Sequence, residues 1–212
     1  MHLQSFRVGP FAENTYMLSK DGKAVLIDPG FSNKEEFNQL ETALKNDRSS
    51  LQAIILTHAH VDHIIGIPLV LSRYEIPVYL CDKDYYLWEN YSIQAKKFGF
   101  QVEDFDFIPE ILPIKEEWNI EGFTFEVRYT PGHAPDHISL YSKQDDLLIV
   151  GDALFREGVG RTDLYKGDMK ILKTSIREQL YTLPENTTVC PGHGPETTIG
   201  HEKKANPFVQ AK

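Results

Sequence analysis

The sequence predicts an α/β protein in which helices lie outside β-sheets. Strand and helix signals alternate along the chain in two rounds, and such a pattern is typical of sheets covered by helices. The 212 residues fall in the range of one large domain, and a hydrophobic content of 41% is enough for a sizeable core. No domain boundary, close internal repeat or low-complexity tract is visible, so we predict a single domain over residues 1–212.

The individual elements follow from the periodicity of the apolar residues. The first round predicts strands near residues 6–28, 51–57 and 77–81, and helices near 34–45, 64–74 and 82–98. The second round predicts strands near 123–130, 137–142, 147–151 and 187–190, with a helix near 168–181 and a short final helix.

A dense group of metal-ligand residues lies between two of these elements. Residues 57–63 read Thr-His-Ala-His-Val-Asp-His, so His58, His60, Asp62 and His63 fall within six consecutive positions. Chance would produce this group in roughly one chain in a thousand of this composition, a rate against which a short motif must be weighed. Because a strand precedes it and a helix follows, we expect the motif on a loop. There, His58 and His60 can converge on one cation, and Asp62 and His63 on a second.

The ligand types indicate a catalytic metal site. Zinc, iron and manganese accept mixed imidazole and carboxylate ligands. Structural zinc sites usually include cysteine, whereas this chain has only Cys81 and Cys190 and no Cys-x-x-Cys pair. An open, catalytic site is therefore favoured.

Three further candidate ligands occur downstream, each directly after strand-like sequence. His133 lies in TPGH, Asp152 ends LLIVGD, and His193 lies in CPGHG. Since three strand ends each deliver one ligand, we expect these ends to meet at one edge of a sheet.

The segments HAHVDH, TPGHAPDH, GDALF and PGHGPETT, in this order, resemble the metallo-β-lactamase superfamily of hydrolases. The opening segments GPFAENTYML and VLIDPG resemble the first two strands of that fold, and the final GHGPETTIGHEKKANPF is similar to its small glyoxalase II-like branch. The resemblance therefore covers nearly the whole chain. It implies a four-layer αββα sandwich with the metal site at one edge of the sheets.

The resemblance also implies a ligand set for two divalent metal ions, with zinc as the first expectation and iron or manganese as alternatives. The two sets would be His58, His60 and His133 for one ion, and Asp62, His63 and His193 for the other, with Asp152 bridging both. Asp62 and Asp152 would thereby take part in catalysis. Asp28 matches a family position that hydrogen-bonds near the ligands, although Asp-Pro-Gly is also an ordinary turn sequence.

The implied reaction is hydrolysis of a thioester of the hydroxyacylglutathione type by attack of a metal-bound hydroxide. A thiolate leaves readily without an acid catalyst, since thiols have pKa values of about 8.5. The alternative is a mononuclear iron persulfide dioxygenase of the same fold, whose glycine-arginine loop is similar to GVGRTD at residues 158–163. A scaffold that binds metal without turnover is a third reading. A β-lactamase is disfavoured, because such enzymes are normally exported and no secretory signal is visible.

Substrate contacts are less constrained by the sequence. Arg161, Lys166 and His137 are candidates, but the arginine could instead brace its loop and His137 could support the start of a strand. We expect no separate C-terminal substrate-binding domain, because the sequence ends soon after Phe208. We therefore expect weak recognition of the glutathione portion of a substrate.

The formal net charge of -9, with scattered basic residues, argues against a nucleic-acid surface. No apolar run approaches the roughly 20 residues that would span a bilayer. We expect a cytoplasmic enzyme with reduced cysteines that acts on a small-molecule thioester or related thiol-derived substrate. The sequence leaves the oligomeric state open.

Overall fold

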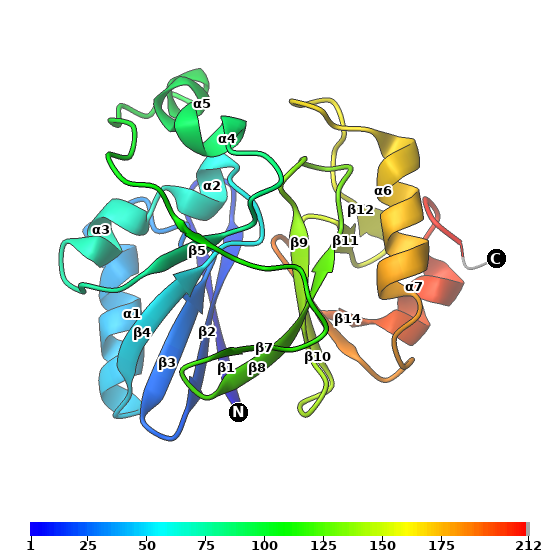
Figure 1. Cartoon of the computed structure of the whole chain (residues 1–212), viewed down its shortest axis with the longest axis horizontal. Coiled ribbons are helices and arrows are strands. Elements are labelled where there is room, and N and C mark those ends of the chain that lie inside the picture. The colour runs from blue at the N-terminus through cyan, green and yellow to red at the C-terminus, as the bar shows by residue number, and fades with distance from the viewer. Residues whose placement is uncertain (211–212) are drawn as a thin grey trace. The chain divides into compact units, whose positions relative to one another are not determined.

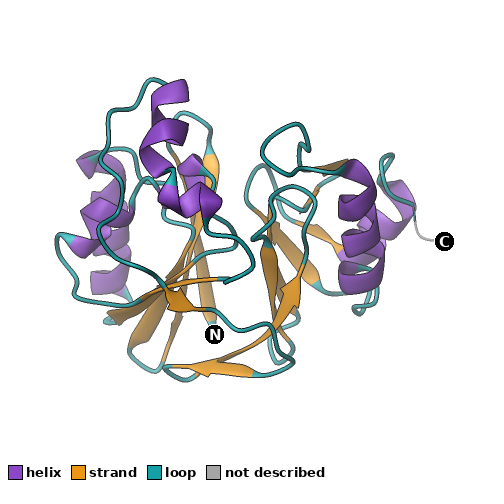
Figure 2. Ribbon diagram, turned by 45° about the horizontal axis from the view of Figure 1, so that its top comes forward, coloured by secondary structure: helices purple, strands orange, loops and turns teal. Residues whose placement is uncertain are grey.

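The computed structural model describes residues 1–210 and divides into two compact units, unit 1 (Met1–Leu112) and unit 2 (Pro113–Lys212). Each unit has its own mixed β-sheet with helices packed against it (Figures 1 and 2). The prediction of sheets flanked by helices is confirmed.

In unit 1, the described residues form a six-stranded sheet in the order β1-β2-β3-β4-β5-β6. Its strands are β1 (His2–Val8), β2 (Glu13–Lys20), β3 (Lys23–Ile27), β4 (Ser50–Ile55), β5 (Val78–Leu80) and β6 (Glu110–Ile111). The first three strands pair antiparallel, whereas β3 to β6 run parallel. The helices are α1 (Lys34–Asn46), α2 (Val61–Ile64), α3 (Ile67–Leu71), α4 (Tyr86–Glu89) and α5 (Tyr91–Lys97).

In unit 2, the described residues form a second six-stranded sheet in the order β14-β13-β10-β9-β8-β7 and a separate hairpin, β11-β12. The strands are β7 (Trp118–Ile120), β8 (Phe123–Tyr129), β9 (Ile138–Ser142), β10 (Leu147–Gly151), β11 (Leu154–Phe155), β12 (Gly158–Val159), β13 (Thr188–Pro191) and β14 (Thr197–Thr198). Helix α6 (Met169–Ser175) continues into a π-helix, η1 (Ile176–Leu180), and the last helix is α7 (Ile199–Ala205).

Helix α1 illustrates how local sequence produces an element. The side chain of Asn33 caps its amino end by accepting a hydrogen bond from the backbone N–H of Glu36. Acidic residues in the first turn and Lys45 in the last turn complement the helix dipole. The buried face consists of Phe37, Leu40, Ala43 and Leu44, at the three-to-four-residue spacing of an amphipathic helix.

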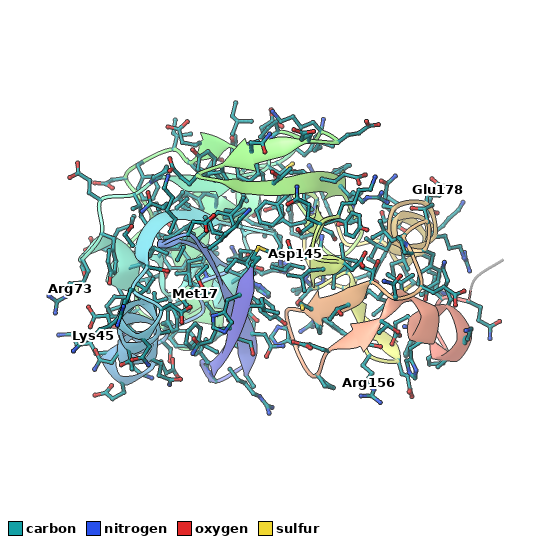
Figure 3. The ribbon with its side chains drawn as sticks, turned by 90° about the horizontal axis from the view of Figure 1, so that it is seen from below. Met17, Lys45, Arg73, Asp145, Arg156 and Glu178 are labelled. Atoms are coloured by element: carbon teal, nitrogen blue, oxygen red, sulfur yellow. The ribbon has the colours of Figure 1, made fainter. Side chains whose placement is uncertain are left out.

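Figure 3 shows the resulting separation of apolar and charged side chains in unit 1. Met17 of β2 is fully buried, whereas Lys45 and Arg73 extend outwards. Seven of the eight residues of β2 are buried, because both faces of this strand are covered. Among the described residues, no helix combines the length and the apolar character that crossing a bilayer requires.

Two expected helices differ from the structure. The helix expected at 64–74 begins earlier, at Val61, and is split into α2 and α3, because Val61 and Ile64 are buried three residues apart and stabilise a helical turn. The metal-ligand motif is therefore not wholly on a loop. The helix expected at 82–98 is interrupted at Asn90, which adjoins both α4 and α5.

Gly132 fixes the contact between the end of β8 and α6. Its φ is +123°, and its carbonyl accepts a hydrogen bond from the backbone N–H of Asp168 at 2.8 Å. A Cβ at this position would lie 2.3 Å from the backbone nitrogen of Leu172. Only glycine fits both the backbone conformation and this close approach.

We expect Gly132→Ala to destabilise the protein by roughly 3 kcal/mol or more, because it adds backbone strain to overpacking. Thermal unfolding should show a decrease in Tm of roughly 6–12 °C. Gly122→Ala is the matched control, because Gly122 also has a positive φ, of +94°, but a Cβ added there would meet no heavy atom within 4 Å. Equal losses of stability in the two variants would contradict the packing argument.

Candidate metal centre

The unit 1 part of the candidate centre is built where two parallel strands end side by side. Ile27 of β3 pairs with Ile55 of β4, so the segments that follow both strands emerge at the same edge of the sheet. Asp28 therefore meets Thr57, whose backbone N–H donates a hydrogen bond to Asp28 Oδ1 at 2.7 Å. Asp28 is buried and adopts a positive φ of 50°, so its strained backbone is held by this network.

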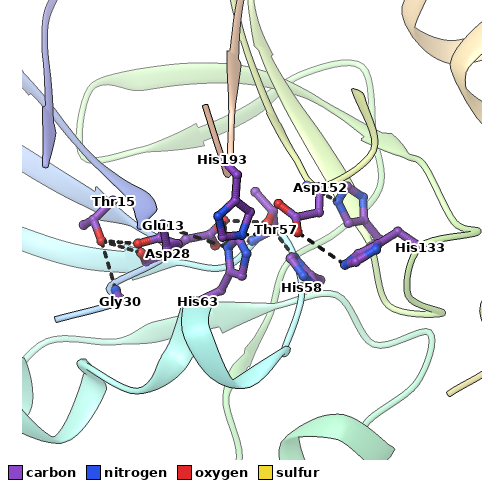
Figure 4. A network of polar contacts seen from close by, with 11 residues as sticks. Glu13, Thr15, Asp28, Gly30, Thr57, His58, His63, His133, Asp152 and His193 are labelled. Atoms are coloured by element: carbon purple, nitrogen blue, oxygen red, sulfur yellow. Dashed lines mark hydrogen bonds and ion pairs between the residues drawn. The ribbon is translucent and has the colours of Figure 1, made fainter. Parts of the chain in front are cut away.

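The protons in this network can be assigned by counting donors and acceptors (Figure 4). The Thr57 hydroxyl donates to Asp28 Oδ2 at 2.6 Å, so its oxygen must accept the hydrogen bond from His58 Nδ1 at 3.0 Å. His63 Nδ1 lies 3.0 Å from Asp28 Oδ2 and donates to it. One carboxylate, directly for His63 and through Thr57 for His58, thus fixes both rings as Nδ1-protonated tautomers, in which Nε2 is the nitrogen that could bind a metal ion.

The four residues of the HxHxDH motif are brought together within unit 1. His58 and His60 leave β4 on a loop, and His60 occupies the position before the first residue of α2. Asp62 and His63 lie in α2 itself. The ring of His58 is centred 4.8 Å from that of His60 and 4.2 Å from that of His63. The three imidazoles are buried, whereas Asp62 is half-buried.

Glu13 is a second carboxylate beside His63 that the sequence did not single out. Its Oε1 lies 3.8 Å from His63 Nδ1, and its Oε2 accepts a hydrogen bond from the Thr15 hydroxyl at 2.7 Å. Among the described residues, Oε1 has no hydrogen-bond partner. Burial raises the pKa of Glu13 well above its usual value, although the interaction with His63 opposes this shift.

In unit 2, three strands deliver one candidate ligand each to the same edge of the sheet. β8, β10 and β13 run in the same direction, because β8 and β10 are both antiparallel to β9 and β13 is parallel to β10. His133, Asp152 and His193 follow these strands. Asp152 Oδ2 lies 3.6 Å from His133 Nε2 and 3.5 Å from His193 Nε2. The expectation that the three strand ends meet is confirmed.

The loop that contains Arg161 orients His133. The backbone carbonyl of Arg161 accepts a hydrogen bond from His133 Nδ1 at 2.8 Å, so Nε2 is again the unprotonated nitrogen. The Arg161 side chain is exposed and forms a bidentate ion pair with Asp163, with two N···O distances of 2.7 Å. This pair lowers the pKa of Asp163 to about 2.

His137 lies in the interior of unit 2, in agreement with the structural alternative to a substrate contact. It is fully buried, and its Nε2 accepts a hydrogen bond from the backbone N–H of Asp152 at 3.0 Å. Its Nδ1 therefore carries the proton and lies 2.9 Å from the Thr130 hydroxyl. Since both nitrogens bind within the protein, His137 supports the backbone that carries Asp152.

Lys166 is exposed, and its ammonium lies 5.2 Å from the centre of the Tyr165 ring, a cation–π contact. Its role in substrate binding stays a prediction. Cys81 and Cys190 are both buried, and neither is joined in a disulfide. Burial raises the pKa of the Cys190 thiol, with a smaller contribution from Glu196.

The donors in each unit fit divalent metal ions. Unit 1 offers three buried imidazoles and a half-buried carboxylate, and unit 2 offers two imidazoles around one carboxylate oxygen. Mixed nitrogen and oxygen donors of this kind suit zinc, iron and manganese. The ligand atoms of Asp28, His58 and His63 lie within 4.8 Å of one another. Asp28 already accepts three hydrogen bonds, two from Thr57 and one from His63.

A model of the metallo-beta-lactamase superfamily matches residues 8–193. Among curated proteins, the chain is 39% identical to the probable metallo-hydrolase YqgX of Bacillus subtilis, over 95% of this chain and 94% of the relative. It is 33% identical to the hydroxyacylglutathione hydrolase GloC of Haemophilus influenzae, over the full length of both chains.

Solved structures give the same result. The B3 metallo-beta-lactamase BLEG-1 superposes with a TM-score of 0.87 at 37% identity and covers 98% of this chain and 99% of its own. The protein TTHA1623 in a di-iron-bound form superposes with a TM-score of 0.86 at 35% identity, over 97% of this chain and 100% of its own. The expected fold class is confirmed by these matches.

We expect Asp28→Asn to weaken metal binding by about 10- to 100-fold. Both carboxylate oxygens of Asp28 accept hydrogen bonds from Thr57 or His63, whereas the NH2 group of an asparagine side chain cannot accept one. Competition with a chromophoric chelator measures this change. Asp21→Asn is the control, since Asp21 also has a positive φ but is exposed. Unchanged metal affinity in folded Asp28→Asn protein would remove Asp28 from the orienting role.

Proposed function

The chain belongs to the metallo-beta-lactamase superfamily of metal-dependent hydrolases, and on this basis we propose that it hydrolyses thioesters of the hydroxyacylglutathione type. The observation that carries this choice is the end-to-end match to a relative named hydroxyacylglutathione hydrolase. That relative covers the same length as this chain, so the similarity extends beyond the metal-binding motifs.

We propose that the donors of the two units serve a pair of divalent ions. Following the family pattern, one ion would be held by His58, His60 and His133, and the other by Asp62, His63 and His193. Asp152 would bridge them. The di-iron form of TTHA1623 supports a binuclear centre and makes iron an alternative to zinc.

When bound, the two ions supply a Lewis acid for the substrate carbonyl and make hydroxide available from water at neutral pH. The chain contributes the placement of the donors. Asp28 and Thr57 hold the Nδ1 protons of two imidazoles, and the Arg161 carbonyl holds that of His133. His137 fixes the backbone of Asp152. No protein acid is required for departure of the thiolate, because a thiol with a pKa of about 8.5 is a good leaving group.

Recognition of glutathione requires partners for its carboxylates. Arg161, Lys166 and Lys143 are exposed cations of unit 2. Arg161 is already engaged in its bidentate pair with Asp163, so recruiting it would mean exchanging one carboxylate for another. We therefore propose that the metal centre and the acyl group dominate substrate selection, with a weaker contribution from glutathione.

Hydrolysis of β-lactams is a second candidate, which the similarity to BLEG-1 favours. Its chemistry differs in the leaving group, since an amide nitrogen must be stabilised or protonated as it departs. A persulfide dioxygenase reaction would instead consume oxygen. These three reactions have separate readouts and can be measured on one protein preparation.

We expect the wild-type protein to bind about two divalent ions per chain, and Asp152→Ala to lose one or both. The substitution keeps the backbone N–H that donates to His137, so the fold should survive. Loss of the bridging carboxylate should lower kcat/KM by at least about 100-fold, equivalent to several kcal/mol of transition-state stabilisation. Elemental analysis, circular dichroism and steady-state kinetics measure the three quantities.

Asp106→Ala is the control for this experiment, because it removes a carboxylate that is exposed and is not one of the proposed ligands. Full activity of metal-loaded Asp152→Ala would exclude Asp152 from the centre. A reproducible single iron per wild-type chain would contradict the binuclear proposal and favour the dioxygenase.

We expect the protein to hydrolyse S-D-lactoylglutathione and a lactoyl thioester of a neutral thiol with similar kcat values. Two charge-assisted contacts to glutathione would contribute about 1.5–3 kcal/mol each. Without them, KM for lactoylglutathione should be high, and kcat/KM for the two substrates should differ by less than about 100-fold. Thiol release measures both reactions. Nitrocefin hydrolysis and oxygen uptake with glutathione persulfide measure the alternatives.

A micromolar KM for lactoylglutathione, with kcat/KM at least about 100-fold above that of the neutral thioester, would reveal a dedicated glutathione site. Turnover of nitrocefin or persulfide in place of both thioesters would overturn the proposed function.

A further inference from the structure

The β11–β12 hairpin of unit 2, residues 153–160, lies between the proposed ligand Asp152 and the residue that orients the proposed ligand His133. Asp152 directly precedes it, and Arg161, whose carbonyl holds His133 Nδ1, directly follows it. The backbone N–H of Gly160 lies 3.5 Å from the carbonyl of Ala153 and closes the base of the hairpin. The position of this base therefore sets both the Asp152 backbone and the acceptor for His133.

The base is packed without spare room. A Cβ on Gly160 would lie 1.9 Å from the backbone oxygen of Asp152 and 3.0 Å from His133 Nδ1. Because not even a methyl group would fit between the hairpin and these two residues, a displacement of the hairpin must move them or open a gap beside them.

The tip of the hairpin is held by two buried side chains of the last helical segment. Glu202 Oε2 accepts a hydrogen bond from the backbone N–H of Glu157 at 2.9 Å. Asn206 Nδ2 donates to the carbonyl of Gly158 at 2.9 Å and to Glu202 Oε2 at 2.8 Å. Glu202 is fully buried, and Asn206 is 1% exposed.

A buried carboxylate such as that of Glu202 is an unfavourable choice if the side chain only fills space. Its second oxygen, Oε1, accepts a hydrogen bond from the Thr197 hydroxyl at 2.6 Å, so three donors surround one buried carboxylate. Burying a carboxylate is costly unless such donors are present, and an apolar side chain would avoid that cost. What the carboxylate adds is an acceptor for the N–H of Glu157, a residue with a positive φ of 55°. Glu202 thus holds the tip of the hairpin at Glu157, the residue with the strained backbone.

We propose that Glu202 and Asn206 are positioning residues that hold the metal ligands His133 and Asp152 in place through the β11–β12 hairpin. This inference rests on the proposed ligand set. The two residues touch neither ligand, and they act by fixing the tip of the hairpin whose base carries the ligand contacts.

The test compares Glu202→Gln and Asn206→Ala with Arg156→Ala. Arg156 lies at the tip of the same hairpin but is exposed and points away from the protein (Figure 3), so its removal leaves both tip contacts intact. Each protein is loaded with Co²⁺, and its visible absorption spectrum and its retention of metal against a chelator are measured. Circular dichroism and Tm report the fold separately.

We expect Glu202→Gln and Asn206→Ala to shift or broaden the Co²⁺ absorption bands and to lower metal retention by about 10- to 100-fold, while Arg156→Ala matches the wild type. A fall in kcat at constant metal occupancy should accompany the change. If Glu202→Gln does not fold, Asn206→Ala decides the question, because Glu202 keeps its contacts with Thr197 and Glu157 in that variant.

Folded variants with wild-type spectra and wild-type metal retention would overturn the inference, even if their Tm falls. A wild-type protein that binds no divalent ion would instead contradict the proposed function. The two failures are therefore distinguishable.

Discussion

A histidine that binds a metal through one ring nitrogen almost always donates a hydrogen bond from the N–H of its other nitrogen to a carboxylate, a backbone carbonyl or water. This constraint organises the candidate metal ligands in each unit. In unit 1, the acceptors are the Thr57 hydroxyl and the Asp28 carboxylate, and in unit 2 the acceptor for His133 is the Arg161 carbonyl. In each case Nδ1 carries the proton. The acceptors lie on the segments that follow the strands, or on nearby loops, and are thereby placed beside the imidazole rings.

Burial of carboxylates is the main electrostatic cost of this arrangement, and the protein deals with it in different ways. Asp28 and Glu202 each accept three hydrogen bonds, which replace the lost water. Glu13 accepts one from Thr15, and its raised pKa favours the neutral form. Divalent cations would further offset the charge near His63, so the formal net charge of -9 overstates the acidity of the loaded protein.

The sequence was sufficient to predict the sheets with their outer helices and the convergence of His133, Asp152 and His193, because long apolar strands ending in a polar ligand leave a strong pattern. It did not reveal β6, β11, β12 or β14, which have two residues each and therefore no periodicity. Asn90 interrupts a helix that side-chain spacing alone made continuous. Thr57, Glu202 and Asn206 escaped notice because their roles depend on partners far along the chain. The ENTY segment was visible, but nothing in it indicated that Glu13 would lie beside His63.

The burial of Cys190 has a consequence for the proposed hydrolysis of thioesters. A thioester can transfer its acyl group to any accessible thiolate, and Cys190 lies only three residues from His193. Its raised pKa keeps it as a thiol, and its side chain is fully buried, as is that of Cys81. Both cysteines are thus protected from self-acylation and from exchange with the thiols that the reaction would release.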